Sequence, residues 1–191
     1  MAGSEQTQRL FFCFDLPTSA KEIIAEYQAE LKKYGQGVAW TRIENTHLTL
    51  KFLGDTKVAT VDKIGEVMGK IAQETSIIEL AFDKVGAFPS MKSPKVLWIG
   101  CSNVPDEIKI LHKRLTRDLR SLGFESENRE YTPHLTLGRV KLGNVDKIIE
   151  KMKESTAPVF SFRAHELILM KSELKRTGPV YTEIKNSALN N

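Results

Sequence analysis

The sequence predicts an α+β fold in which antiparallel sheets carry helices on their outer faces. Short apolar runs typical of strands alternate with segments of helical apolar spacing, and short turns join several strand pairs, which favours antiparallel pairing. The tetrapeptide His-Leu-Thr-Leu occurs in each half of the chain, at residues 47–50 and 134–137. This repeat suggests an internal duplication. We therefore expect a bilobal molecule with a pseudo-two-fold axis, in which two antiparallel sheets face a central cleft.

The composition is that of an ordinary globular protein. Of 191 residues, 41% are hydrophobic and 27% are charged, and the formal net charge of +4 permits a polyanionic partner without requiring one. No apolar run approaches the length of a membrane span, and the first residues lack the apolar stretch of a signal peptide. We therefore expect no membrane association and a cytoplasmic location. Cys13 and Cys101 lie in apolar segments and are expected to be buried thiols of a reducing compartment.

The first half of the chain contains two segments with helical spacing. One predicts a helix over Ala20–Tyr34, capped by Thr18 or Ser19 and ended by Gly35. The other predicts a helix over Val61–Ala72, where the apolar residues fall on one face. Short apolar runs predict strands over Arg9–Leu16, Val38–Ile43, His47–Leu53, Ile77–Phe88 and Val96–Cys101.

The second half repeats this style. Helices are predicted over Pro105–Leu122, with Gly123 as its stop, and over Val145–Met152. Pro133 indicates a strand start or an edge strand, because proline donates no hydrogen bond to a ladder. A basic turn, Lys171–Pro179, is expected to join the last two strands. The predicted strands of this half are Tyr131–Val140, Phe160–Met170 and Val180–Ile184.

No linker rich in proline, glycine or serine separates the two halves. We therefore expect residues 1–191 to form a single domain of two intertwined lobes, each with one copy of the repeated tetrapeptide.

The repeated tetrapeptide carries the predicted chemistry. Successive side chains of a strand alternate between its faces, so histidine and threonine point one way and the two leucines point toward a core. His47 and His134 would then meet across the cleft. One neutral imidazole can take a proton from water while one imidazolium protonates a leaving alkoxide. A pair of histidines arranged in this way suits acid–base chemistry on a phosphodiester.

Three further side chains are placed to bind a phosphate. Thr49 and Thr136 offer hydroxyl groups beside the histidines, and Arg139 offers a planar fork that fits phosphate oxygens. No carboxylate or cysteine accompanies the motifs at ligand spacing, so we expect neither a metal nor a cofactor.

Three other residues have expected roles outside the acid–base and phosphate group. Tyr131 is a candidate to stack on a base of the substrate. Phe52 would share the face of the leucines and is expected in the core. His112 borders the leucine stripe of a predicted helix and is expected at a surface or boundary position.

With these residues in place, the chain resembles the 2H phosphoesterase superfamily, which is named for paired His-x-Thr-x motifs. The resemblance is greatest to its RNA 2′,3′-cyclic phosphodiesterase family, also called 2′-5′ RNA ligase. It extends over nearly the whole chain. The matching segments are Arg9–Phe12, Glu44–Gly54, Gly86–Ser90, Pro94–Trp98, Leu122–Phe124, Thr132–Arg139 and Gly178–Tyr181.

This resemblance implies hydrolysis of a terminal 2′,3′-cyclic phosphate on RNA to a 2′-phosphomonoester without a metal. It implies that His47 is the proton donor to the 3′ oxygen and that His134 is the proton acceptor that activates water. Thr49, Thr136 and Arg139 would hold the phosphate. Members of the family can also join a cyclic-phosphate end to a 5′-hydroxyl through a 2′-5′ bond. The expected partner is RNA with such an end, with tRNA fragments among the candidates, and the expected state is a monomer.

Two other functions stay open. The protein could be a 2H esterase that acts on a small cyclic nucleotide or on an ADP-ribose cyclic phosphate. It could also be a binding module that holds RNA ends without turnover. Intact histidines in both motifs argue against the binding module, because binding alone needs no acid–base pair.

Overall fold

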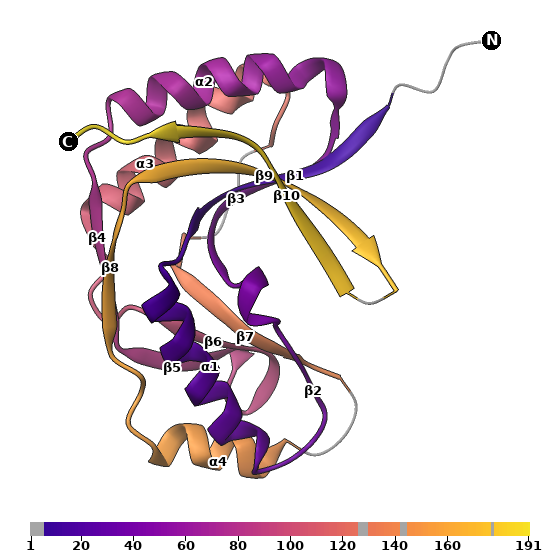
Figure 1. Ribbon diagram of the computed structural model, residues 1–191, viewed down its shortest axis with the longest axis vertical. Helices are drawn as coiled ribbons and strands as arrows, with labels where there is room; N and C mark the ends of the chain where they lie inside the picture. The colour runs from indigo at the N-terminus through magenta and orange to yellow at the C-terminus, as the bar shows by residue number, and fades with distance from the viewer. Residues whose placement is uncertain (1–5, 126–129, 142–144, 177) are drawn as a thin grey trace.

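The computed structural model describes residues 6–125, 130–141, 145–176 and 178–191. In this part of the chain the strands form two four-stranded sheets and one two-stranded sheet, all with antiparallel pairing. The first sheet lies in the upper half of Figure 1 and the second in the lower half, and the two-stranded sheet runs between them at one side. The predicted α+β class with helices outside antiparallel sheets is confirmed.

The first sheet has the strand order β10-β9-β1-β3, so β3 is one of its end strands. The first His-Leu-Thr-Leu copy opens β3. The bounds of its strands are β1 Thr7–Asp15, β3 His47–Lys57, β9 Glu166–Lys175 and β10 Gly178–Ala188.

The second sheet has the order β2-β7-β6-β5, and the second His-Leu-Thr-Leu copy opens β7, an inner strand. Pro133 directly precedes this strand, so the predicted strand start is correct. The strands of the second sheet are β2 Val38–Trp40, β5 Lys84–Ser90, β6 Ser93–Gly100 and β7 His134–Val140. The two-stranded sheet pairs β4 Ile78–Phe82 with β8 Phe160–Ala164.

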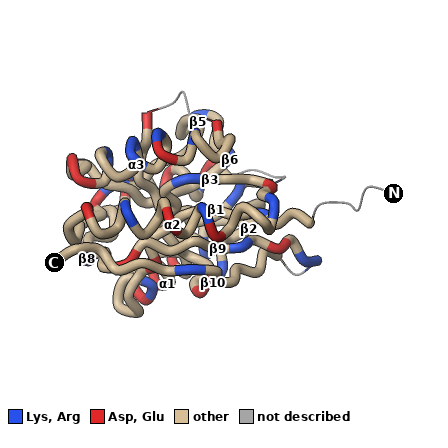
Figure 2. Tube along the Cα trace, turned by 90° about the horizontal axis from the view of Figure 1, so that it is seen from above, with Lys and Arg blue, Asp and Glu red and all other residues tan. Residues whose placement is uncertain are grey.

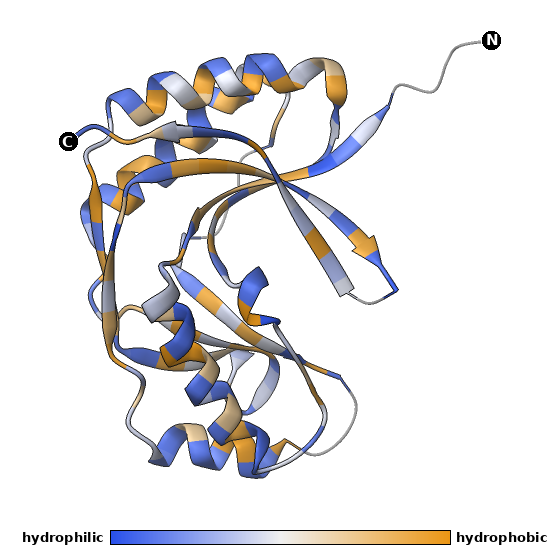
Figure 3. Cartoon of the chain, in the orientation of Figure 1, coloured by the Kyte–Doolittle hydropathy of each residue, from blue (hydrophilic) through white to orange (hydrophobic). Residues whose placement is uncertain are grey.

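Four α-helices of the described ranges cover the outer faces. In Figure 1, α2 lies along the top of the molecule and α4 at its bottom; α3 contacts α2, and α1 contacts α4. Hydrophobic and hydrophilic residues alternate along α2 in Figure 3, and its buried side chains include Ile64, Met68 and Ile71. The helices are α1 Thr18–Lys32, α2 Val61–Gln73, α3 Asp106–Asp118 and α4 Asp146–Glu154, with single 3-10 turns at Ile43–Asn45, Val58–Thr60 and Leu119–Leu122.

The order of the elements repeats along the chain. The series β1-α1-β3-α2-β4-β5 is followed by β6-α3-β7-α4-β8-β9, with β2 and β10 as additions. The last strand of each series pairs with the first strand of the other: β9 pairs with β1, and β5 pairs with β6. This exchange gives the two sheets their pseudo-two-fold relationship. The prediction of a single domain stays a prediction.

Two predicted strands are each divided between two sheets. Residues 77–88 contain all of β4 and most of β5, with Asp83 between them. Residues 160–170 contain β8 and part of β9, with His165 between them. A continuous apolar run does not reveal such a break, because both parts are apolar and extended. The breaks allow β4 and β8 to pair with each other.

Two local predictions were wrong. The predicted turn Lys171–Pro179 is mostly strand, because β9 continues to Lys175 and β10 begins at Gly178. This hairpin extends beyond the main core, so polar residues suit both of its faces. Thr18 and Ser19 do not cap α1: Pro17 occupies that position in an extended conformation, without a side-chain cap hydrogen bond.

The core anchors both motif strands. Leu48, Leu50, Leu135 and Leu137 are buried, as the alternation of the motif predicts. Cys13 is buried and Cys101 is partly buried. Among the described residues, no helix combines the length and apolarity needed to cross a bilayer. Basic and acidic residues are interspersed over the elements in Figure 2, so charge alone does not select one face for a polyanion.

Candidate active site

The two motif histidines come from the two facing sheets. His47 opens β3, His134 opens β7, and these strands contact each other. Both side chains are partly buried. The charge of His134 lowers the pKa of His47, so the two imidazoles lie within electrostatic range of each other.

Both imidazoles are held through the same ring nitrogen. His47 Nδ1 lies 2.8 Å from the carbonyl oxygen of Asn45, and His134 Nδ1 lies 2.9 Å from that of Thr132. Because a carbonyl oxygen only accepts, each Nδ1 carries the proton and donates it. Nε2 of each ring is therefore the nitrogen left to exchange a proton. The acceptor is in both cases the residue two positions before the histidine.

Aromatic rings fix the orientation of both imidazoles. Phe11 stacks on His47 with ring centroids 4.8 Å apart, and Tyr181 meets the same imidazole edge-on at 5.0 Å. Phe88 meets His134 edge-on at 4.9 Å. Such ring contacts stabilise a single side-chain orientation.

Burial lowers the pKa of both histidines below the ordinary value of 6.5, because a partly dry surrounding disfavours the imidazolium. The backbone hydrogen bonds from Nδ1 oppose this effect at both sites. At His134 the positive charge of Arg139 lowers the pKa further.

These shifts predict an acidic pH profile. A general base must be neutral and a general acid must be protonated, so lowering both pKa values moves both limbs of kcat/KM to lower pH. We expect the maximum below pH about 6.5, the ordinary pKa of histidine. A maximum on the alkaline side of neutrality would contradict this assignment. The same shifts make the free energy of unfolding depend on pH. Their contribution to stability is fully present above the unfolded-state pKa of histidine and is lost as pH falls through the lowered folded-state pKa values.

The threonines lie two positions after their histidines, on the same faces of their strands. Thr49 lies opposite Cys13 on β1, and Thr136 lies opposite Trp98 on β6. Trp98 needs Gly86 on the neighbouring strand, because a Cβ at that position would overlap the indole ring. Both hydroxyl groups are thus presented from paired strands beside the histidines.

Arg139 is exposed on β7. Its positive charge lowers the pKa of His134 on the same strand. Burial raises the pKa of Tyr181 on β10, and the charge of Arg139 opposes that rise. The guanidinium therefore acts on residues of both sheets, which is where a phosphate between the two motifs would need it.

Phe52 does not share the face of the leucines. The register between β1 and β3 shifts at Leu50, so Phe12 lies opposite Lys51 while Cys13 lies opposite Thr49. The extra residue turns Lys51 into the interior, and Phe52 returns to the face of His47. Phe52 is 58% exposed, and its ring lies 5.8 Å from that of Phe11, which stacks on His47.

Sequence reasoning therefore missed the aromatic group around His47, which consists of Phe11, Phe52 and Tyr181. Strict alternation along the strand predicted the opposite face for Phe52. Phe11 and Tyr181 lie within segments that carry the family resemblance, but their contact with His47 depends on strand pairing that the sequence does not state.

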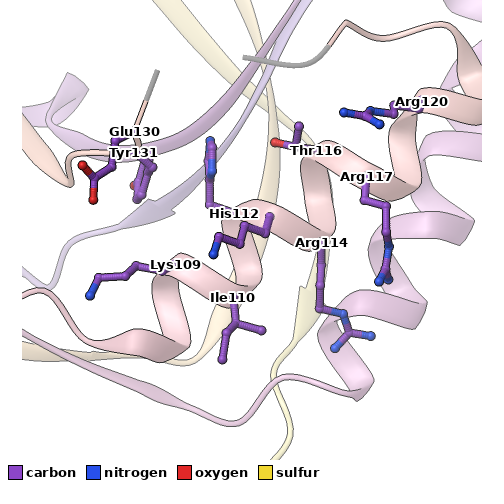
Figure 4. Close-up of a pocket in the computed structure, with 10 residues that line it drawn as sticks. Lys109, Ile110, His112, Arg114, Thr116, Arg117, Arg120, Glu130 and Tyr131 are labelled. Atoms are coloured by element: carbon purple, nitrogen blue, oxygen red, sulfur yellow. The ribbon is translucent and has the colours of Figure 1, made fainter. Parts of the chain in front are cut away.

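Tyr131 and His112 form a contact of their own. Their rings stack with centroids 4.4 Å apart and an interplanar angle of 12°, as Figure 4 illustrates. His112 is only 6% exposed, so the expected surface or boundary position is wrong. The phenol of Tyr131 donates to the carbonyl oxygen of Thr49 at 2.8 Å. The expectation that Tyr131 stacks on a substrate base stays untested.

The pocket in Figure 4 lies over α3 and contains neither motif histidine among its lining residues. Its basic side chains include Lys109, Arg114 and Arg117, each of which is paired with an acidic neighbour. Within the described ranges, no group of three or more histidine, cysteine, aspartate or glutamate side chains could hold a metal ion.

The two motif histidines lie on strands of two facing sheets, and each forms an Nδ1 hydrogen bond to a backbone carbonyl oxygen. The chain belongs to the 2′-5′ RNA ligase superfamily, whose family model matches residues 16–176, and the predicted family is thereby confirmed. The RNA 2′,3′-cyclic phosphodiesterase of Methanocaldococcus jannaschii is 35% identical over 179 residues, covering 93% of this chain and 98% of that protein. The Escherichia coli protein of the same name is 29% identical over 190 residues, covering 96% of this chain and 98% of its own.

A solved structure has the same fold. The crystal structure of Escherichia coli LigT complexed with 3′-AMP matches with a TM-score of 0.80 at 28% sequence identity. The match covers 97% of this chain and 100% of that chain.

Proposed function

We propose that the protein hydrolyses 2′,3′-cyclic phosphate ends of RNA to 2′-phosphomonoesters. The observation that carries this proposal is the pair of imidazoles held by Nδ1 on facing sheets, each with Nε2 left for proton exchange. Relatives named RNA 2′,3′-cyclic phosphodiesterase, at 35% and 34% identity over most of the chain, support the same activity.

In the proposed reaction, His134 accepts a proton from water through Nε2 as the water oxygen attacks phosphorus. The bond between phosphorus and the 3′ oxygen breaks, and His47 donates its proton to that oxygen. The products are a 2′-phosphomonoester and a free 3′-hydroxyl. The assignment of donor and acceptor rests on the resemblance to the family, since both imidazoles have equivalent hydrogen bonds.

Thr49, Thr136 and Arg139 would hold the phosphate. Donors placed at oxygens on which negative charge develops stabilise the transition state more than the ground state. The two hydroxyl groups come from the two motif strands, and the guanidinium acts on residues of both sheets. Phe52, exposed on the His47 face, is a better placed surface for a base than Tyr131, whose ring already packs on His112.

The experiment uses a short RNA with a 2′,3′-cyclic phosphate end, incubated in EDTA, with the product resolved as 2′- or 3′-phosphate. We expect a 2′-phosphate at an unchanged rate in the chelator. A 3′-phosphate product, or activity that depends on added metal, would contradict the proposed reaction.

Hydrolysis of a small cyclic nucleotide is the second candidate. It is favoured by the Escherichia coli LigT crystals, which hold 3′-AMP in one structure and phosphate in another. Comparing kcat/KM for a cyclic mononucleotide and for a cyclic-phosphate RNA separates the two. The 2′-5′ ligation, tRNA fragments as substrate, the monomeric state and the cytoplasmic location stay predictions.

A further inference from the structure

We propose that Tyr131 is a positioning residue that fixes the first motif strand relative to the second. The inference rests on the proposed function and concerns the same site. It starts from a single hydrogen bond: the Tyr131 hydroxyl donates to the carbonyl oxygen of Thr49 at 2.8 Å. Thr49 is a residue whose side chain would hold the phosphate, and Tyr131 belongs to the segment that leads into the other motif.

Within the described part of the chain, the strand that receives this bond has a strand partner on one side only. β3 is an end strand of the first sheet and pairs with β1 on one side. A carbonyl on the other side of an end strand has no ladder partner, and a side-chain donor can satisfy it. The Tyr131 hydroxyl does so at Thr49, the central residue of the first motif. The position of this strand edge therefore depends on where the phenol is held.

The segment that carries the phenol is itself tied to the second histidine. Tyr131 lies three residues before His134, and between them the carbonyl oxygen of Thr132 accepts the hydrogen bond from His134 Nδ1. Pro133 is buried, and its ring restricts both its own backbone and that of Thr132. Residues 131–134 thus contact both motifs through a short and stiff connection.

The ring of Tyr131 packs against the side chain of His112. His112 on α3 is buried and lies parallel to the phenol, with ring centroids 4.4 Å apart (Figure 4). Helix α3 also contacts β3. Packing against a helix leaves the phenol little freedom to turn away from Thr49. Removal of the hydroxyl should therefore loosen β3 while the ring keeps its place.

The test compares Tyr131→Phe with Tyr131→Leu. Phenylalanine keeps the ring and loses only the hydroxyl, so a positioning role predicts a fall in kcat of about three- to tenfold, the equivalent of one net hydrogen bond, at unchanged KM. A base-stacking role predicts wild-type kcat and KM for Tyr131→Phe and a raised KM for Tyr131→Leu. Unchanged kcat in Tyr131→Phe would overturn the proposal.

Tyr27→Phe is the matched control. Tyr27 is a partly buried tyrosine on α1, and its hydroxyl lies 3.5 Å from Oγ of Ser155, the residue that follows α4. We expect similar melting temperatures for Tyr27→Phe and Tyr131→Phe, and wild-type kcat for Tyr27→Phe only. Equal losses of kcat in the two variants would assign the effect to general destabilisation and overturn the proposal.

Amide hydrogen exchange tests the same contact without a substrate. Peptides that cover residues 48–52 should exchange faster in Tyr131→Phe than in the wild type, and not in Tyr27→Phe. Unchanged exchange in Tyr131→Phe would overturn the proposal whatever the kinetics. If the wild type does not hydrolyse cyclic-phosphate RNA, the proposed function fails, and the exchange comparison still decides whether Tyr131 fixes the strand.

Discussion

Replacement of His134 by alanine is expected to lower kcat by roughly 10²- to 10⁴-fold, the usual contribution of a positioned general acid or base. The variant has no imidazole Nε2 to take a proton from water. The same loss is expected for His47→Ala, which has no donor for the leaving 3′ oxygen. The measurement is kcat on a cyclic-phosphate RNA, with the melting temperature and the affinity for the 2′-phosphate product as checks on the fold.

A double variant that lacks both motif histidines tests whether they act together. The proposed reaction uses the two histidines together, so His47→Ala combined with His134→Ala should be little slower than either single variant. His165→Ala is the control, since His165 is exposed between β8 and β9 and belongs to neither motif. Substantial activity in either single motif variant would rule out the paired mechanism.

Arg139→Ala is expected to have the second largest effect, a fall in kcat/KM of roughly 10²- to 10³-fold, the usual loss for one donor to a developing negative charge. It should also change the pH profile. Because the charge of Arg139 lowers the pKa of His134, its removal should raise that pKa and move the limb that reports His134 to higher pH.

Arg139→Lys separates charge from shape. Lysine retains a positive charge but not the planar fork, so the limb should stay near its wild-type pH while kcat/KM remains lowered. Arg163→Ala, the loss of an exposed arginine on β8, is the charge-matched control. If Arg139→Ala and Arg163→Ala have the same small effect, Arg139 does not bind the phosphate.

The fold class and the repeated motif could be predicted because each has a local signal. Alternation within His-Leu-Thr-Leu predicts buried leucines, and Leu48 and Leu135 are fully buried. The spacing of apolar residues predicts the helices that the described ranges contain. These signals depend only on neighbours along the chain, which is what a sequence records directly.

The missed features depend on partners that are distant in the chain. The shift in register at Leu50 reverses the face of Phe52, and nothing in the residues 47–53 marks it. Asp83 and His165 divide apolar runs because β4 and β8 pair across 80 residues of chain, as between Ala81 and Ser161. Tyr131 reaches Thr49 from the other half of the chain. Sequence spacing alone carries no information about such contacts.

The exchange of β5 and β9 between the sheets has a consequence for synthesis on the ribosome. β1 emerges well before its neighbour β9, which spans Glu166–Lys175. The strand that bears His47 therefore belongs to a sheet that is incomplete until β9 and β10 have been synthesised. A nascent chain stalled after β6 would have an unpaired edge on β1 and an apolar face uncovered, the state in which a chaperone binds and in which aggregation begins.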